Sequence, residues 1–174
     1  MTASEARSEP QASEVRGPEA RSEPQASEVE KLGRLLAIAT KEKTRAPMLE
    51  HAALRVGPGG LPGERSHPSG RAVTVLSREA WAAACRDLGT SLPWTLRRAN
   101  LLVEGIELIG SVGRRLHVGA LVLEIGEETE PCRVMDAIHP GLRRALTPDW
   151  RGGVTCRVLT PAEIRVGAVV RLAP

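Results

Sequence analysis

The chain has 174 residues, a formal net charge of +3, and neither phenylalanine nor tyrosine. Its first 30 residues carry three Arg and seven Glu (−4), which leaves +7 for the remainder, and a mildly basic domain without aromatic stacking platforms favours a small anionic molecule or cofactor over nucleic acid. Three dispersed cysteines, no apolar run of roughly 18 residues and no signal-peptide pattern argue against a disulfide framework, a membrane span and export, and indicate the cytoplasm.

The chain opens with a duplicated segment. EARSEPQASEV occupies Glu5 to Val15 and recurs unchanged at Glu19 to Val29. Its Ser, Glu, Pro, Gln and Ala residues cannot bury enough apolar surface to offset the entropy of the chain. Residues 1–31 are therefore predicted to form a disordered acidic tail, for which a short docking role is the alternative, and residues 32–174 to form one domain.

The first half of that domain shows strand, loop and helix signals in turn. Short apolar runs predict strands over 35–38, 52–56 and 72–76, and the Gly/Pro-rich stretch 56–71 predicts a long loop before the last of these. Ser77 is a typical N-cap, Gly89 a typical stop, and the apolar spacing between them predicts a helix over 78–88. Cys85 falls on its apolar face and is expected to lie in the core.

The second half is rich in short strands separated by glycines, which suggests a barrel or a sandwich. Leu121, Leu123 and Ile125 alternate with more polar residues and should point inward. Cys156 alternates in the same way and is expected to be buried. The predicted elements are strands over 101–103, 106–109, 116–118, 120–125, 154–158 and 168–172, and two helical pieces within 133–146, broken at 139–141.

Cys132 is the cysteine that this assignment leaves without a structural role. It follows Pro131, whose fixed φ would hold the thiol in a loop after a buried strand. A thiol becomes a metal ligand or nucleophile as the thiolate, which nearby cations or a metal favour. The arginines that could supply such charge are Arg65, Arg71, Arg133, Arg151 and the pairs Arg97-Arg98, Arg114-Arg115 and Arg143-Arg144.

A zinc site and a Cys-His hydrolase are the other two roles that this thiol could have. No CxxC or HxxxH spacing is present, which disfavours a zinc site. A Cys-His hydrolase stays open because a loop cysteine and several histidines permit one. The histidines concerned are His51, His67, His117 and His139.

Five segments, taken in order, resemble the MOSC family, the molybdenum cofactor sulfurase C-terminal domains, and most of all its small free-standing bacterial members. The resemblance covers about residues 32–172. The segments are GLPGERSH (60–67), RAVTVLS (71–77), LPWTLRRANLLVEGIEL (92–108), LHVGALVLEIGEETEPC (116–132) and RGGVTCRVLTPAEIRVGAVVRL (151–172).

This resemblance implies a mainly β fold, a distorted β-barrel of MOSC type flanked by short helices. In some members the cysteine after proline, here Pro131-Cys132, carries sulfur as a persulfide; in others it ligates the metal of a molybdenum-pterin cofactor (molybdopterin). Some members of the second kind reduce N-hydroxylated or other N-oxygenated compounds. Others are fused to pyridoxal-phosphate sulfurtransferase domains, so a separate sulfur donor or redox partner protein is expected here.

The same resemblance assigns candidate site residues. Cys132 would be the catalytic sulfur carrier or the metal ligand. The cofactor-binding candidates are Arg65, His67, Arg71, Arg98 and Asn100. The chain departs from the family where an arginine often stands three residues before the cysteine, because that position is Thr129, with carboxylates nearby at Glu127, Glu128 and Glu130. The alternative function is therefore a non-catalytic barrel with a degenerate pocket that binds an anion or a partner through its arginines.

Overall fold

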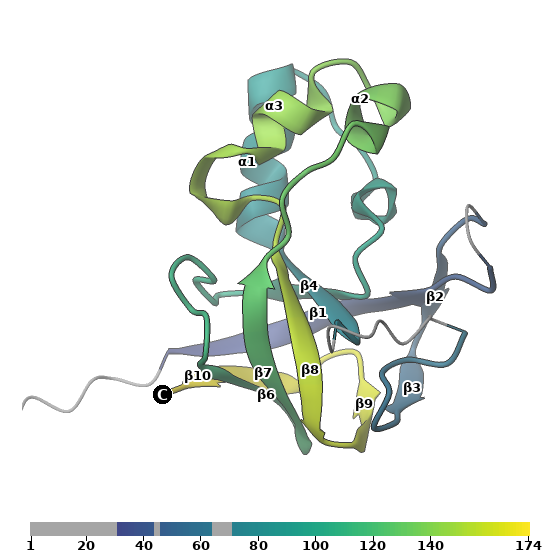
Figure 1. The fold of residues 1–174 in the computed structure, drawn as a ribbon, viewed down its shortest axis with the longest axis vertical. Coiled ribbons are helices and arrows are strands. Elements are labelled where there is room, and N and C mark those ends of the chain that lie inside the picture. Colours follow the sequence, from purple (N-terminus) through teal and green to yellow (C-terminus); the bar gives the residue numbers. More distant parts are fainter. Residues whose placement is uncertain (1–30, 44–45, 64–70) are drawn as a thin grey trace, which may run out of the picture.

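The computed structural model of the chain describes residues 31–43, 46–63 and 71–174. Its strands form a barrel, and its helices gather at one end of that barrel (Figure 1). The predicted tail lies outside the described residues except for Lys31, as does part of the predicted loop over 56–71.

Seven strands close the barrel in the order β10-β6-β7-β8-β4-β5-β1, and β1 then pairs with β10. In the described part of the chain, β4 and β5 run parallel and the other pairings are antiparallel. The mainly β prediction is thus confirmed. The barrel strands are β1 (Leu32–Thr40), β4 (Val73–Ser77), β5 (Leu101–Glu104), β6 (Arg115–Val118), β7 (Leu121–Glu128), β8 (Val154–Thr160) and β10 (Val169–Ala173).

Three short strands lie outside this closed ring. β2 (Leu49–His51) extends the sheet beside β1, and β3 (Ala53–Val56) pairs with β9 (Ala162–Arg165). Sequence patterning did not predict β2 or β9, because three or four residues with few apolar side chains give too little alternation to recognise.

The barrel interior is filled by the alternating residues of its strands. Leu121, Leu123 and Ile125 are all fully buried, as predicted. Cys156 also lies inside, only 1% exposed. Burial raises the pKa of its thiol to about 12, so this cysteine stays neutral and serves as a small core residue.

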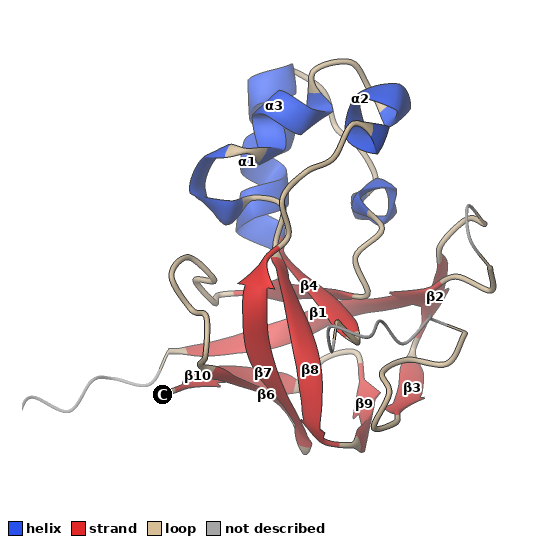
Figure 2. Cartoon of the chain, in the orientation of Figure 1, coloured by secondary structure: helices blue, strands red, loops and turns tan. Residues whose placement is uncertain are grey.

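The helices form a layer at one end of the strands (Figure 2), and a second apolar cluster joins this layer to the barrel. Val75 of β4 faces the barrel interior, whereas the next residue, Leu76, packs with Trp81 of α1 and Leu142 of α3. The barrel wall around β4 is therefore buried on both faces. The helical elements are α1 (Arg78–Leu88), α2 (Val134–Ile138), α3 (Leu142–Leu146) and the 3-10 turns η1 (Trp94–Arg97) and η2 (Pro148–Trp150).

The helix boundaries follow the predicted signals. The Ser77 hydroxyl accepts a hydrogen bond from Ala80 N at 3.3 Å, and α1 ends at Gly89, whose φ of 65° is left-handed. The break between α2 and α3 falls at the predicted residues 139–141, where Gly141 has φ 82°.

Two predicted strands need correction. The strand over 106–109 is wrong: Gly105 has a φ of 74°, and the chain leaves β5 there and continues without a ladder. Ile106 and Leu108 are nonetheless buried, so their alternation reported burial rather than a strand. The strand predicted to end at 125 instead continues as β7 to Glu128, because pairing with β8 carries the acidic residues into the sheet.

Candidate functional site

The three cysteines occupy three different environments. Cys156 is buried, Cys85 is half-buried, and Cys132 is exposed. Cys132 lies on the short segment 129–132, which carries the chain from the end of β7 in the barrel to the start of α2 in the helical layer. The one thiol that the sequence left without a packing role is therefore also the one open to solvent.

Backbone contacts fix this segment at both ends. Thr129 N donates to Gly153 O at 2.8 Å, and the carbonyl of Cys132 accepts from Met135 N at 3.0 Å, which begins α2. The thiol thus stands on a restrained stretch of backbone rather than on a free loop.

Two arginines from distant elements hold the carbonyls just before the thiol. Arg97, the last residue of η1, donates from Nη2 to Thr129 O at 3.1 Å, and Arg143 of α3 donates from Nε to Pro131 O at 3.3 Å. Gly152 allows the first contact, because a Cβ at this position would overlap Thr129 O and lie 3.3 Å from Arg97 Nη2. Glycine is required there, because any side chain would block the close approach.

Arg97 is an unusual cation because it is only 6% exposed. In the described ranges it forms no ion pair with a carboxylate, and its Nε has no hydrogen-bond acceptor. Burial lowers the pKa of its guanidinium, and electrostatic interaction with Cys132 partly offsets that effect. The hydroxyl of Thr129 is also buried, with no hydrogen-bond partner among the residues that the structure describes.

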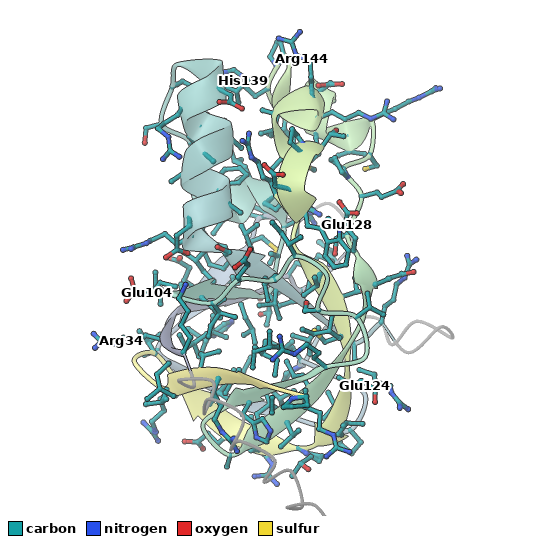
Figure 3. The ribbon with its side chains drawn as sticks, turned by 90° about the vertical axis from the view of Figure 1, so that its left-hand side faces the viewer. Arg34, Glu104, Glu124, Glu128, His139 and Arg144 are labelled. Atoms are coloured by element: carbon teal, nitrogen blue, oxygen red, sulfur yellow. The ribbon has the colours of Figure 1, made fainter. Side chains whose placement is uncertain are left out.

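Carboxylates lie on this segment and just before it. Glu127, Glu128 and Glu130 line a cavity of about 530 Å³ together with Arg71, Thr129 and Thr155. Arg71 forms an ion pair with Glu127. Burial raises the pKa of the Glu128 carboxyl, and the neighbouring charge of Glu130 adds to the effect. Figure 3 shows Glu128 at the junction of barrel and helices, whereas His139 and Arg144 lie at the far end of the helical layer.

The structure brings together only some of the predicted site residues. Arg71 lines the acidic cavity beside the segment of Cys132. Arg98, in a left-handed conformation (φ 62°), donates to Ala46 O at 3.1 Å. Arg65 and His67 lie outside the described residues.

Asn100 connects strands of the barrel. Its side chain accepts from Thr74 N at 2.9 Å and donates to Ala39 O at 3.3 Å, while its backbone bonds the same two residues. Asn100 is 5% exposed, so these contacts give its amide a structural role in the barrel wall.

Sequence reasoning grouped Arg97 and Arg143 with many other arginines and did not assign them to the site. No pattern distinguishes Arg97 from Arg98, because the left-handed turn at Arg98 decides which of the two side chains enters the interior. Among the described residues, no group of three metal-binding side chains is present, and His51 and His139 contact Thr40 and Pro140.

The fold and this site define a small closed β-barrel with an exposed cysteine at the end of one strand, under a helical layer. A family model described as "MOSC domain" matches residues 62–171, well over half of the chain. The chain belongs to the MOSC domain family. No curated protein matches this chain significantly.

Solved structures share the fold at low sequence identity. The YuaD protein from Bacillus subtilis is 16% identical with a TM-score of 0.70, covering 81% of this chain and 95% of that one. YiiM from Geobacillus stearothermophilus is 18% identical with a TM-score of 0.67, covering 82% and 75%. YiiM from Escherichia coli is 16% identical with a TM-score of 0.61, covering 81% and 70%.

MOSC domains are associated with the molybdenum cofactor, and the residues described fit such a group in two respects. Cys132 offers an exposed soft ligand, and Arg97 offers a nearby positive charge with an unused N–H.

None of the helices in the described ranges is long and apolar enough to cross a membrane.

Proposed function

We propose that this protein is a sulfur-handling MOSC domain in which Cys132 is the reactive group, carrying sulfur as a persulfide or ligating a molybdenum-pterin cofactor. The observation that carries the proposal is the position of Cys132. It is the exposed cysteine, on a restrained segment, beside a buried guanidinium that lacks a carboxylate partner in the described chain.

Sulfur carriage needs only this thiol and a donor of sulfane sulfur. The Cys132 thiolate attacks the terminal sulfur of a donor persulfide, R–S–S–H. The donor S–S bond breaks, R–S⁻ leaves with the electron pair, and Cys132–S–S–H forms. No net oxidant or reductant is required, because the donor arrives already oxidised at the sulfane level. The expected partner, a sulfur donor protein, would supply the persulfide R–S–S–H, because Cys132 supplies the accepting thiol.

Cofactor binding would use the same sulfur as a metal ligand. A molybdenum-pterin, when bound, would supply two-electron redox chemistry for N-hydroxylated or other N-oxygenated compounds. The chain would contribute Cys132 as a soft ligand, Arg97 as a nearby charge, and the backbone contacts of residues 129–132 as the fixed support. Arg65, His67, Arg71, Arg98 and Asn100 remain the predicted pocket residues.

One experiment tests both forms of the proposal. The protein is purified from a host that makes the cofactor, and molybdenum, pterin and cyanide-releasable sulfur are measured in wild type, Cys132→Ser and Cys85→Ser. We expect at least one of the three in wild type and Cys85→Ser, and a loss of it in Cys132→Ser. Absence of all three from the wild type would contradict the proposal.

A second function, a non-catalytic barrel that binds an anion or a partner, has an observation in its favour. Arg71 is already paired with Glu127, and Asn100 is engaged in the barrel wall, so two predicted cofactor ligands have other partners. If the protein is such a non-catalytic barrel, Cys132→Ala should bind its anion or partner with the affinity of wild type. Calorimetry measures this for an anion, and a pull-down measures it for a partner protein.

A further inference from the structure

The buried guanidinium of Arg97 has no structural reason to be charged. A guanidinium offers five N–H donors, and the acceptor found for Arg97 in the described chain is the carbonyl of Thr129. A single neutral hydrogen bond returns little of the free energy lost when a charge leaves water. Burying this charge without a carboxylate partner in the described chain is unfavourable. We therefore look for an anion that is present at this position only while the protein carries out its reaction.

Cys132 is the group placed to supply that anion. It lies three residues after Thr129, whose carbonyl accepts from Arg97 at 3.1 Å, and a negative charge on its sulfur would raise the pKa of the Arg97 guanidinium. Arg143 contacts the same segment, but its side chain is exposed, so water screens its charge. Glu128 and Glu130 line the cavity beside this segment, and their charges would oppose an anion.

We propose that Arg97 is the internal counter-ion of the sulfur anion formed at Cys132, and that it makes this site selective for anionic sulfur species. This inference rests on the proposed function, because it assigns a role within the sulfur chemistry of the same cysteine. Arg97 is a positioning residue: it acts on the sulfur through its fixed charge and through Thr129, and does not itself contact a donor.

The role fits the step written above. After transfer, Cys132–S–S–H releases its proton to solvent and leaves the anion Cys132–S–S⁻, while the donor departs as R–S⁻. Both products carry negative charge next to the same buried guanidinium. Since the guanidinium is fixed by Thr129 O and the close contact at Gly152, it needs no rearrangement when that charge forms.

The first test uses substitutions that separate charge from packing. Arg97→Met keeps the length and removes the charge, and Arg97→Lys keeps the charge. Arg97→Met removes the cost of burying a charge but also removes the donor to Thr129 O. We therefore expect it to unfold in urea at a concentration close to that of wild type, yet to retain several-fold less cyanide-releasable sulfur after treatment with glutathione persulfide. Arg97→Lys should recover most of the loss.

The second test measures local charge directly. Rates of mixed-disulfide formation at Cys132 are followed by mass spectrometry with anionic dithiodiglycolate, neutral hydroxyethyl disulfide and cationic cystamine. The ratio of anionic to cationic rates does not depend on how much thiolate is present. Loss of the charge of Arg97 should lower this ratio roughly three- to tenfold. Arg133→Met, at the exposed arginine beside Cys132, is the matched control and should change it less.

The outcomes are distinguishable. A lowered ratio and lowered sulfur retention in Arg97→Met, both recovered in Arg97→Lys, support the inference. An unchanged ratio in Arg97→Met overturns it, whatever the sulfur content. If the ratio falls but even the wild type retains no sulfur, the assignment of Arg97 stands and sulfur carriage fails. Should Arg97→Met not fold, Arg97→Gln removes the charge while keeping a donor for Thr129 O and decides the same question.

Discussion

Arg97 Nη2 lies 3.1 Å from the carbonyl oxygen of Thr129, three residues before the exposed thiol of Cys132. The guanidinium reaches the segment of Cys132 from η1, so a contact between distant parts of the chain places a charge there that the linear sequence does not reveal.

The close approach at Gly152 gives a prediction on stability. A methyl group at this position would overlap Thr129 O and crowd Arg97, and neither the backbone nor the buried side chain has room to yield. We expect Gly152→Ala to lower the free energy of unfolding by about 1–3 kcal/mol, measured by urea denaturation. Gly126→Ala is the matched control, because its nearest contact would be an ordinary 3.5 Å. Equal stability of the two variants would contradict the packing described.

The acidic cavity predicts a dependence on pH. The pKa of Glu128 is raised in the folded state by burial and then by Glu130, so the folded protein binds this proton more tightly than the unfolded chain. The stabilisation is fully present below the ordinary pKa of a glutamate and is lost as pH rises through the raised value. Glu128→Gln should therefore stabilise the fold near neutral pH by a few tenths of a kcal/mol and make little difference in acid.

The free energy of unfolding of wild type and Glu128→Gln is measured by urea denaturation, once near neutral pH and once in acid. Glu163→Gln, at an exposed carboxylate paired with Arg165 on β9, serves as the control for removing one surface charge. The account of the cavity is wrong if Glu128→Gln stabilises the protein more in acid than near neutrality.

Much of this architecture could be predicted from local patterns because local physics determines it. The inward alternation of Leu121, Leu123 and Ile125 and the α1 boundaries at Ser77 and Gly89 both follow from geometry within a few residues. Cys132 was reached by elimination in the same way. Each of these features depends on neighbours along the chain.

The rest depends on contacts between distant segments. The burial of Arg97 requires β7, η1 and the turn at Gly152 to meet, and adjacent Arg97 and Arg98 look alike until that happens. Ile106 and Leu108 alternate as a strand would, yet the left-handed Gly105 ends β5 before them. Tertiary packing, which local patterns do not encode, decided the first case. The left-handed backbone at one glycine decided the second.

The role of Asn100 can be tested by separating structure from binding. Its amide bonds Thr74 N and Ala39 O inside the barrel wall, so Asn100→Ala would leave a half-buried N–H and a buried carbonyl without these partners. We expect a loss of about 1–3 kcal/mol in the free energy of unfolding. The loss should be the same in protein made without molybdenum cofactor. A variant that is as stable as wild type and lacks only cofactor would instead make Asn100 a ligand-binding residue.

The order in which the three thiols react gives the last prediction. Cys156 is 1% exposed and burial raises its pKa to about 12, so near neutral pH it is both inaccessible and protonated. Cys132 is exposed, and Cys85 is half-buried against the helical cluster. Native protein treated with iodoacetamide and mapped by mass spectrometry should be labelled first at Cys132, more slowly at Cys85, and at Cys156 only after unfolding in urea. Labelling of Cys156 in the native state at a rate close to that of Cys132 would mean that the barrel opens readily, and the fixed support assigned to residues 129–132, which rests on β7 and β8, would then be lost with it.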